Sequence, residues 1–173
     1  MRDNVPELVN IRTQSIVIAA LLLTLLGATV SAQNSECVPT PRRDLLPDVI
    51  APMAGDDPIW FIDGSGGVWQ GRNTPVKSVW VVARNVTGAL VASGRQINGT
   101  ESLRFRIGLE GPMTDAVRFD DPAAETMIPG SATPELMKRR AFVAAYLFFP
   151  APGCWEIRSR LGATRRTVVL HVK

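Results

Sequence analysis

The chain has 173 residues, a formal net charge of +3 and an apolar fraction of 46%, which excludes wholesale disorder and allows one domain plus a processing segment. Its 13 prolines and 14 glycines favour short elements joined by turns over long helices. The weak net charge and the absence of RNA-module and zinc-finger spacings argue against nucleic acid, and we predict no nucleic-acid partner.

The N-terminal region has the pattern of an export signal. Residues 16–30 read IVIAALLLTLLGATV, an uncharged apolar run that is short for a transmembrane helix, which needs about 20 residues. Basic and acidic residues balance before this run, and Val30 and Ala32 supply small side chains ahead of a cleavage point. We predict a helical signal peptide at residues 1–32. An uncleaved anchor is the alternative, and it is the only membrane contact that we expect.

The two cysteines, Cys37 and Cys154, are predicted to form a disulfide. Export would place them in an oxidising space, where a disulfide persists. The bridge would close a loop of more than a hundred residues, worth about 4–5 kcal/mol in the chain-entropy model. Two unpaired buried thiols are the alternative. Cys37 follows no lipoprotein-type box of small residues, so we expect no lipidation.

Residues 33–55 are rich in proline and show no clear period. Proline forbids a helix or a central strand there, so we predict an extended arm packed over a domain at residues 56–173. The first apolar run of that domain, residues 59–62, precedes the glycine-rich turn 63–67, which predicts a hairpin into Val68-Trp69.

The middle of the chain alternates β-prone runs with turn residues. Strands are predicted at residues 76–84, 89–97 and 103–107. In the third of these runs, Leu103, Phe105 and Ile107 fall on one face. Residues 108–139 form an irregular insertion, with one short strand at 116–119.

A single helical turn is predicted at the end of this insertion. Thr133 is placed as its N-cap and Pro134 as its first helical residue. An irregular segment of this length is either functional or a tolerated insertion.

Three more strands are predicted at residues 141–149, 154–161 and 165–172. Strict alternation divides the last two into an inward and an outward face. The inward set is Trp155, Ile157, Leu161, Val168, Leu170 and Val172, and the outward set is Cys154, Glu156, Arg158, Arg160, Arg165, Thr167 and His171. Seven to nine short strands in all predict an all-β fold, an antiparallel immunoglobulin-like β-sandwich.

Charge is distributed unevenly along the chain. Residues 138–173 carry eight basic residues and one acid, whereas residues 33–137 carry nine basic residues and thirteen acids. The pattern is explained either by solvated strand faces or by an anionic surface partner such as a wall polymer or phospholipid.

The C-terminal motif Phe149-Pro150-Ala151-Pro152-Gly153-Cys154-Trp155-Glu156-Ile157 resembles the F-P-x-P-G-C-W-E-[IV] signature of small exported bacterial proteins of uncharacterised function. Cys37 within a Pro-rich segment, the Ile59-Trp60 to Val68-Trp69 region and the LVASGRQING stretch at 90–99 resemble pieces of the same proteins in the same order. The resemblance implies a β-sandwich fold and an extracytoplasmic location, and it implies no activity.

The sequence contains no recognisable catalytic set. The only histidine, His171, lies two residues from the C-terminus on a predicted outer strand face, and two cysteines with one histidine make a poor metal set. We therefore predict no catalytic residues, no metal site and no cofactor. Trp60, Trp69 and Trp80 are the best ligand candidates because exposed tryptophans stack on sugar rings, although packing in the core is the competing interpretation.

Two hypotheses of function follow. The first is a non-enzymatic extracytoplasmic binding or interaction module, secreted or held in the cell envelope, whose partner is an envelope protein or a wall glycan. The alternative is a secreted hydrolase or hydrolase inhibitor with its site in residues 108–139.

Overall fold

The computed structural model of the protein describes residues 36–44, 51–130 and 132–173. The predicted signal peptide at residues 1–32, with its helix, lies outside the described residues. None of the helices in the described ranges has the length and apolar character required to cross a bilayer.

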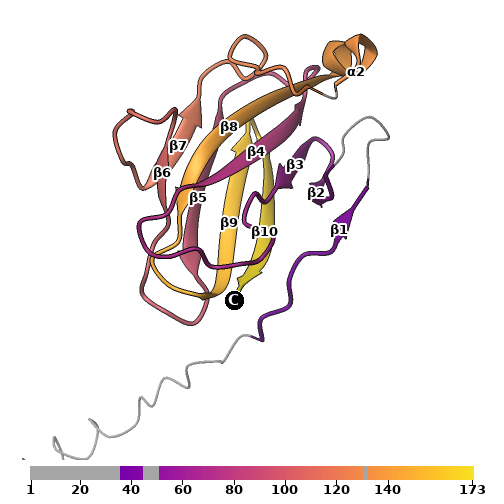
Figure 1. Ribbon diagram of the computed structural model, residues 1–173. Helices are drawn as coiled ribbons and strands as arrows, with labels where there is room; N and C mark the ends of the chain where they lie inside the picture. The colour runs from indigo at the N-terminus through magenta and orange to yellow at the C-terminus, as the bar shows by residue number, and fades with distance from the viewer. Residues whose placement is uncertain (1–35, 45–50, 131) are drawn as a thin grey trace, which may run out of the picture. The chain divides into compact units, whose positions relative to one another are not determined.

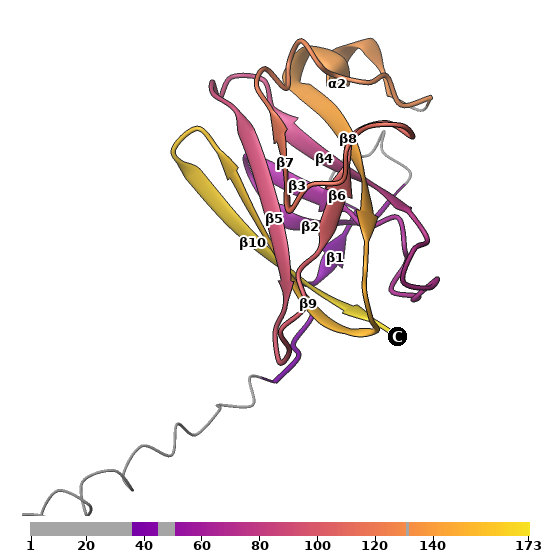
Figure 2. The same cartoon turned by 90° about the vertical axis from the view of Figure 1, so that its left-hand side faces the viewer.

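Two antiparallel sheets pack face to face to form the domain (Figures 1 and 2). In spatial order, the larger sheet consists of β1 (Arg42–Arg43), β2 (Met53–Asp56), β3 (Ile59–Ile62), β4 (Val76–Ala83), β8 (Arg140–Phe148) and β6 (Arg104–Arg106). The smaller sheet consists of β10 (Thr164–Val172), β9 (Gly153–Leu161), β5 (Leu90–Gln96) and β7 (Ala116–Phe119). This arrangement confirms the predicted all-β antiparallel sandwich.

The described residues contain ten strands, one more than the upper end of the predicted range. The difference arises in the Pro-rich arm, which contributes β1 and β2 at one end of the larger sheet. β2 begins directly after Pro52 and contains no proline, so its backbone N–H groups remain free to pair. β2 pairs with β1 on one side and with β3 on the other, so the prediction that the arm contains no central strand is wrong at its C-terminal end.

The predicted hairpin from residues 59–62 into Val68-Trp69 is wrong, although its turn forms. β3 pairs instead with β4, and the N–H of Trp69 donates to the carbonyl of Lys173 at 2.7 Å. The turn itself is held by Asp63, which accepts from the Ser65 hydroxyl at 2.7 Å and from Arg42 at 2.6 Å. These contacts direct the chain towards the end of β10 and away from β3.

The main core lies between the two sheets and confirms the predicted alternation. All six residues predicted to face inward from β9 and β10 belong to this cluster, with exposed fractions of 4% or less. Trp80 of β4 meets Phe61 edge to face, with ring centroids 5.0 Å apart. Aromatic pairs in this geometry contribute beyond their burial alone.

The predicted strand at residues 103–107 is shorter in the structure, where β6 covers Arg104–Arg106. Leu103 and Phe105, which were predicted to share a face, are fully buried, but Ile107, predicted on the same face, is 46% exposed. β6 ends at Arg106, and Gly108 has a φ of 68°, which turns the chain away from the strand direction. Ile107, between them, therefore does not continue the alternation. Periodicity alone did not indicate this turn.

The insertion at residues 108–139 contains the predicted short strand, β7, and the predicted helical turn, α2 (Pro134–Arg139). The side chain of Thr133 accepts a hydrogen bond from the N–H of Leu136 at 3.3 Å, and Pro134 occupies the start of the helix. Both assignments are confirmed, because a hydroxyl cap followed by proline is the local chemistry that starts a helix.

The end of the insertion covers the outer face of the larger sheet. A second apolar cluster there is made of Met53, Trp60, Val81, Leu136 and Phe142, with Met127 and Met137 packed against it. The backbone at residue 127 also donates to the carbonyl of Phe142 at 2.7 Å. This part of the insertion therefore buries apolar surface of the sheet.

Candidate functional site

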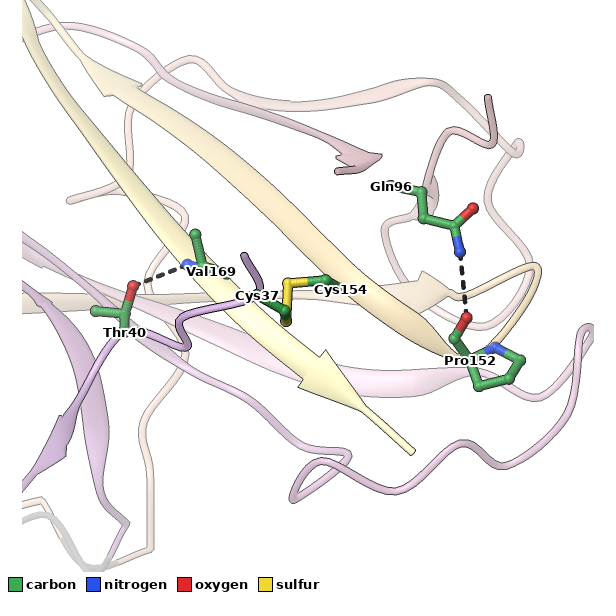
Figure 3. The surroundings of a disulfide bond; sticks show 6 residues. All are labelled: Cys37, Thr40, Gln96, Pro152, Cys154 and Val169. Carbon is green, nitrogen blue, oxygen red and sulfur yellow. Dashed lines mark hydrogen bonds between the residues drawn. A yellow bond between two sulfur atoms is a disulfide. The ribbon is translucent and has the colours of Figure 1, made fainter. Parts of the chain in front are cut away.

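A disulfide joins the arm to the middle of the smaller sheet (Figure 3). Cys37 and Cys154 are bonded, with their Cα atoms 5.7 Å apart and a sequence separation of 117. Cys154 lies on the outward face of β9, as predicted, and so can meet a segment that lies over the sheet. Because the sulfur of Cys37 is committed to this bond, it is not free to carry a lipid.

The arm also pairs with the free edge of β10. The N–H of Thr40 donates to the carbonyl of Val169 at 2.9 Å. The Thr40 hydroxyl accepts from the N–H of Val169 at 2.8 Å (Figure 3). Nearby, the Gln96 amide donates to the carbonyl of Pro152 at 3.2 Å, which ties the end of β5 to the loop before Cys154. An exposed strand edge invites pairing with other chains, so the arm shields this one.

The three tryptophans predicted as ligand candidates lie in three different environments. Trp80 is 0% exposed and lies in the core between the sheets, and Trp60 is 6% exposed in the outer cluster of the larger sheet. The guanidinium of Arg140 covers the Trp60 ring at 4.1 Å. Trp69 is 38% exposed, and its indole N–H donates to the carbonyl of Phe149 at 3.2 Å. The three rings therefore form no shared exposed platform.

The described residues show no arrangement of side chains typical of a metal centre. His171 is exposed on the outer face of β10. Across the described ranges, no cluster of three or more His, Cys, Asp or Glu side chains has the arrangement of a metal site.

A cavity of about 250 Å³ lies beside the insertion, lined in part by Arg84, Asp120 and Asp121. The Asp121 carboxylate accepts from the N–H groups of Ala123 and Ala124 at 3.0 and 3.1 Å. Asp120 pairs with Arg118 at 2.7 Å. Both carboxylates are thus engaged by their own segment, and Asp121 acts as the cap of a turn.

The outer face of the smaller sheet is rich in arginine. Its outward positions carry the exposed arginines Arg95, Arg118, Arg158, Arg160 and Arg165. The one acidic residue among the outward positions of these four strands is Glu156. Basic side chains from four strands are thereby brought onto one surface.

Strand register orders this face into rows, two of which contain the residues that line a hollow. One row runs Arg118, Val91, Arg160, Arg165 across β7, β5, β9 and β10. The next row runs Ser93, Arg158, Thr167 across β5, β9 and β10. A hollow of about 290 Å³ lies at these rows, lined mainly by Val91, Ser93, Arg158, Arg160, Arg165 and Thr167; we call it the arginine groove.

Glu156 balances part of this positive charge. Its Oε1 atom accepts from Arg95 at 3.0 Å and from Arg158 at 2.7 Å. Partial burial by itself raises the pKa of Glu156, but the hydrogen bonds and positive charges of the two arginines outweigh it. The net pKa lies below its usual value of 4.5, so Glu156 is ionised at neutral pH.

The arginine groove was not among the sequence-predicted sites. Alternation in β9 and β10 placed Arg158, Arg160 and Arg165 outward, and the basic bias of residues 138–173 was visible. The contribution of β5 and β7 was not, because their position beside β9 depends on pairings between segments far apart in sequence.

Comparison with known proteins gives a likeness of fold. No family model matches the chain, and no curated protein matches it. The chain is similar to the crystal structure of a "Putative Lipoprotein from Bacillus anthracis", with a TM-score of 0.52 at 12% identity, over 81% of this chain and 88% of that chain. At this identity the likeness concerns the fold alone.

Proposed function

We propose that this protein is an exported, non-enzymatic binding module of the bacterial cell envelope. The observation that carries the binding role is the arginine groove, which opens on the outer face of the smaller sheet and presents guanidinium and hydroxyl groups to solvent. Open, strongly charged surfaces of this kind increase the local concentration of an oppositely charged partner. The partner class is an envelope protein or a wall glycan.

The disulfide supports the extracytoplasmic part of the proposal. Disulfides such as Cys37–Cys154 persist in oxidising compartments and are rare where thiols are kept reduced. The predicted signal peptide at residues 1–32 and the resemblance around Cys154 to small exported bacterial proteins support the same location, and we propose membership of that group. The structural neighbour described as a lipoprotein agrees with an exported origin.

The hydrolase or inhibitor alternative has less support. It needs residues 108–139 to present reactive or docking groups, whereas Leu136 and Met127 of this segment cover the outer face of the larger sheet. The carboxylate of Asp121 is occupied by backbone N–H groups. The binding role rests instead on groups that point away from the domain.

Fractionation and capture together test the proposed function. The full chain, tagged at its C-terminus, is expressed in a bacterium, and its mature mass and location are measured. A chain beginning near residue 33 in the envelope or medium supports export, and a chain retained in the cytoplasm contradicts it. Purified oxidised protein is then mixed with isolated envelope. Retention that survives washing supports binding, whereas loss of all protein at micromolar concentration contradicts it.

A further inference from the structure

We propose that the arginine groove binds a linear polymer that carries phosphate groups along its chain. This inference rests on the proposed binding function and specifies the chemistry of its partner. It is carried by the placement of Arg160 and Arg165, by the partners of the surrounding arginines, and by the absence of aromatic residues from the outward positions of β5, β7, β9 and β10.

Arg160 and Arg165 are a like-charged pair placed directly opposite each other. They are register partners on β9 and β10, both are exposed, and both line the groove. Directly opposite side chains in a sheet lie about 5 Å apart at Cβ, and like charges in this position destabilise the pair. An anion bound between the two guanidinium groups removes this repulsion and gains charge-assisted hydrogen bonds.

The protein itself neutralises Arg95, Arg118 and Arg158 more completely than Arg160 and Arg165, which lie at the hairpin end of β9 and β10. Glu156 binds Arg95 and Arg158, and Asp120 binds Arg118. Within the described ranges, the Arg160 guanidinium donates to the carbonyl of Gly162, at 3.0 Å. Among the described residues, no side chain forms an ion pair with Arg160 or Arg165.

The chemistry of the lining fits phosphate. A guanidinium presents a planar fork of N–H donors that matches two oxygens of one phosphate. The Ser93 and Thr167 hydroxyls flank Arg158 in the neighbouring row and also line the groove, so they add donors for the remaining oxygens.

The extent of the face favours a polymer over a single phosphate ion. The row from Arg118 to Arg165 crosses four strands, a width of about 14 Å from three strand spacings. Along β9, Arg158 and Arg160 are two residues apart, or about 7 Å. One phosphate cannot reach all of these groups, whereas successive phosphates of one chain can. Release of counterions from such a chain makes binding steeply dependent on salt.

A lipid surface and a nucleic acid fit the same face less well. The exposed large apolar residues of the domain, such as Val68, Ile107 and Leu109, lie outside β5, β7, β9 and β10, although insertion of apolar groups is what strengthens binding at a membrane surface. The outward positions of these four strands carry no Phe, Trp or Tyr. Proteins that bind single-stranded nucleic acid stack its bases on such rings.

The test uses oxidised protein purified from cells that express the full chain, with linear polyphosphate of defined length as the probe. Affinity is measured by calorimetry at low and at high salt. We expect R160Q/R165Q to weaken binding at least about tenfold, because each charge-assisted contact contributes about one decade or more in affinity. The matched control, R72Q/R104Q, removes the same charge from residues outside the smaller sheet, and we expect less than about a twofold change.

A gain-of-binding variant keeps the proposal falsifiable even if the arginine variants fold poorly. E156Q removes the acid that engages Arg95 and Arg158, so we expect binding to strengthen by about threefold or more. Urea unfolding of each variant checks that the fold is intact. Polyphosphate binding that is lost in R160Q/R165Q, retained in R72Q/R104Q and increased in E156Q supports the proposal.

Several results overturn it. The first is an equal loss of polyphosphate affinity in R160Q/R165Q and R72Q/R104Q. The second is no binding of polyphosphate at low salt, and the third is binding of orthophosphate as tight as that of the polymer. Tighter binding to vesicles containing phosphatidylglycerol, or to oligothymidine with the same number of phosphates, also overturns it in favour of a lipid or nucleic-acid partner. Retention on isolated envelope without any polyphosphate binding removes this inference and leaves the proposed function standing.

Discussion

The indole N–H of Trp80 donates a hydrogen bond of 2.9 Å to the hydroxyl of Ser159, across the core and between the two sheets. Trp80 is 0% exposed and Ser159 is 5% exposed. An indole N–H is a donor only, and a buried donor without a partner costs free energy. This polar contact therefore joins β4 to β9 across the core and satisfies a buried donor.

Removing the acceptor of this contact should destabilise the fold. We expect S159A to lower the free energy of unfolding by about 1–3 kcal/mol, because the buried Trp80 N–H loses its partner. W80F removes the donor and should also destabilise. The double variant W80F/S159A should lose less than the sum of the single changes, as measured by urea unfolding. Strict additivity would show that the two groups are not coupled.

Removal of the disulfide should also lower stability. The Cys37–Cys154 bridge spans 117 residues, so C37S/C154S should lower the free energy of unfolding by about 2–5 kcal/mol. Unfolding of the oxidised wild type, the reduced wild type and the variant provides the measurement. The reduced wild type and the variant should have the same free energy of unfolding, and reductant should not change the free energy of unfolding of the variant. A variant as stable as the oxidised wild type would be inconsistent with this role.

The turn between β9 and β10 should depend on Gly162. Its φ is 56°, and a Cβ there would lie 2.6 Å from the carbonyl oxygen of Thr87. We expect G162A to lower the free energy of unfolding by about 1–3 kcal/mol. The control is G130A, where a Cβ would meet no atom within 4 Å, and its change should stay within about 0.5 kcal/mol. Equal effects would contradict the steric argument.

The cover formed by α2 can be tested with two residues of the same short helix. Leu136 is 2% exposed, so L136A should lower the free energy of unfolding by about 2–5 kcal/mol. Lys138 makes only an exposed pair with Glu135 at 2.7 Å, so K138A should change it by less than about 0.5 kcal/mol. Thermal or urea unfolding gives both values. Indistinguishable variants would mean that α2 is not packed as described.

Stability should depend on pH through Glu156. A carboxyl group whose pKa is lower in the folded state than its usual 4.5 binds its proton less readily when folded. The contribution of Glu156 to folding stability is therefore complete above its usual pKa of 4.5, and it is lost as the pH falls through the folded pKa. The stability difference between wild type and E156Q should stay constant from about pH 7 to pH 5 and shrink at lower pH. A difference that grows on acidification would reverse the assigned direction of the pKa.

Local chemistry made part of this structure predictable from the sequence. Thr133 followed by Pro134 started α2 because the cap and the fixed φ of proline act within one turn. Trp155 and Cys154 fell on opposite faces of β9 because strand alternation is a backbone property. The disulfide followed from that alternation together with the expected course of the arm.

The missed features depend on tertiary contacts. Val68-Trp69 has strand-like composition, but Trp69 bonds to Lys173, a partner that local sequence does not indicate. The arginine groove needs the register of Arg160 against both Arg165 and Val91, and long-range register is specified by the assembled sheet. Trp60, Trp69 and Trp80 were proposed as ligand candidates from residue type, but in the structure Trp60 and Trp80 are buried and Trp69 is partly exposed.

The position of the disulfide also fixes how the domain would carry a mechanical load. Tension applied on the N-terminal side of Cys37 passes through the sulfur bridge to Cys154, in a strand that is hydrogen-bonded to β10 on one side and β5 on the other. The force then acts on the hydrogen bonds of β9 to both neighbouring strands at once. Without the bridge, it would first break the hydrogen bonds of Thr40 and then separate the two-residue strand β1. The arm is therefore a tether anchored in the interior of a sheet.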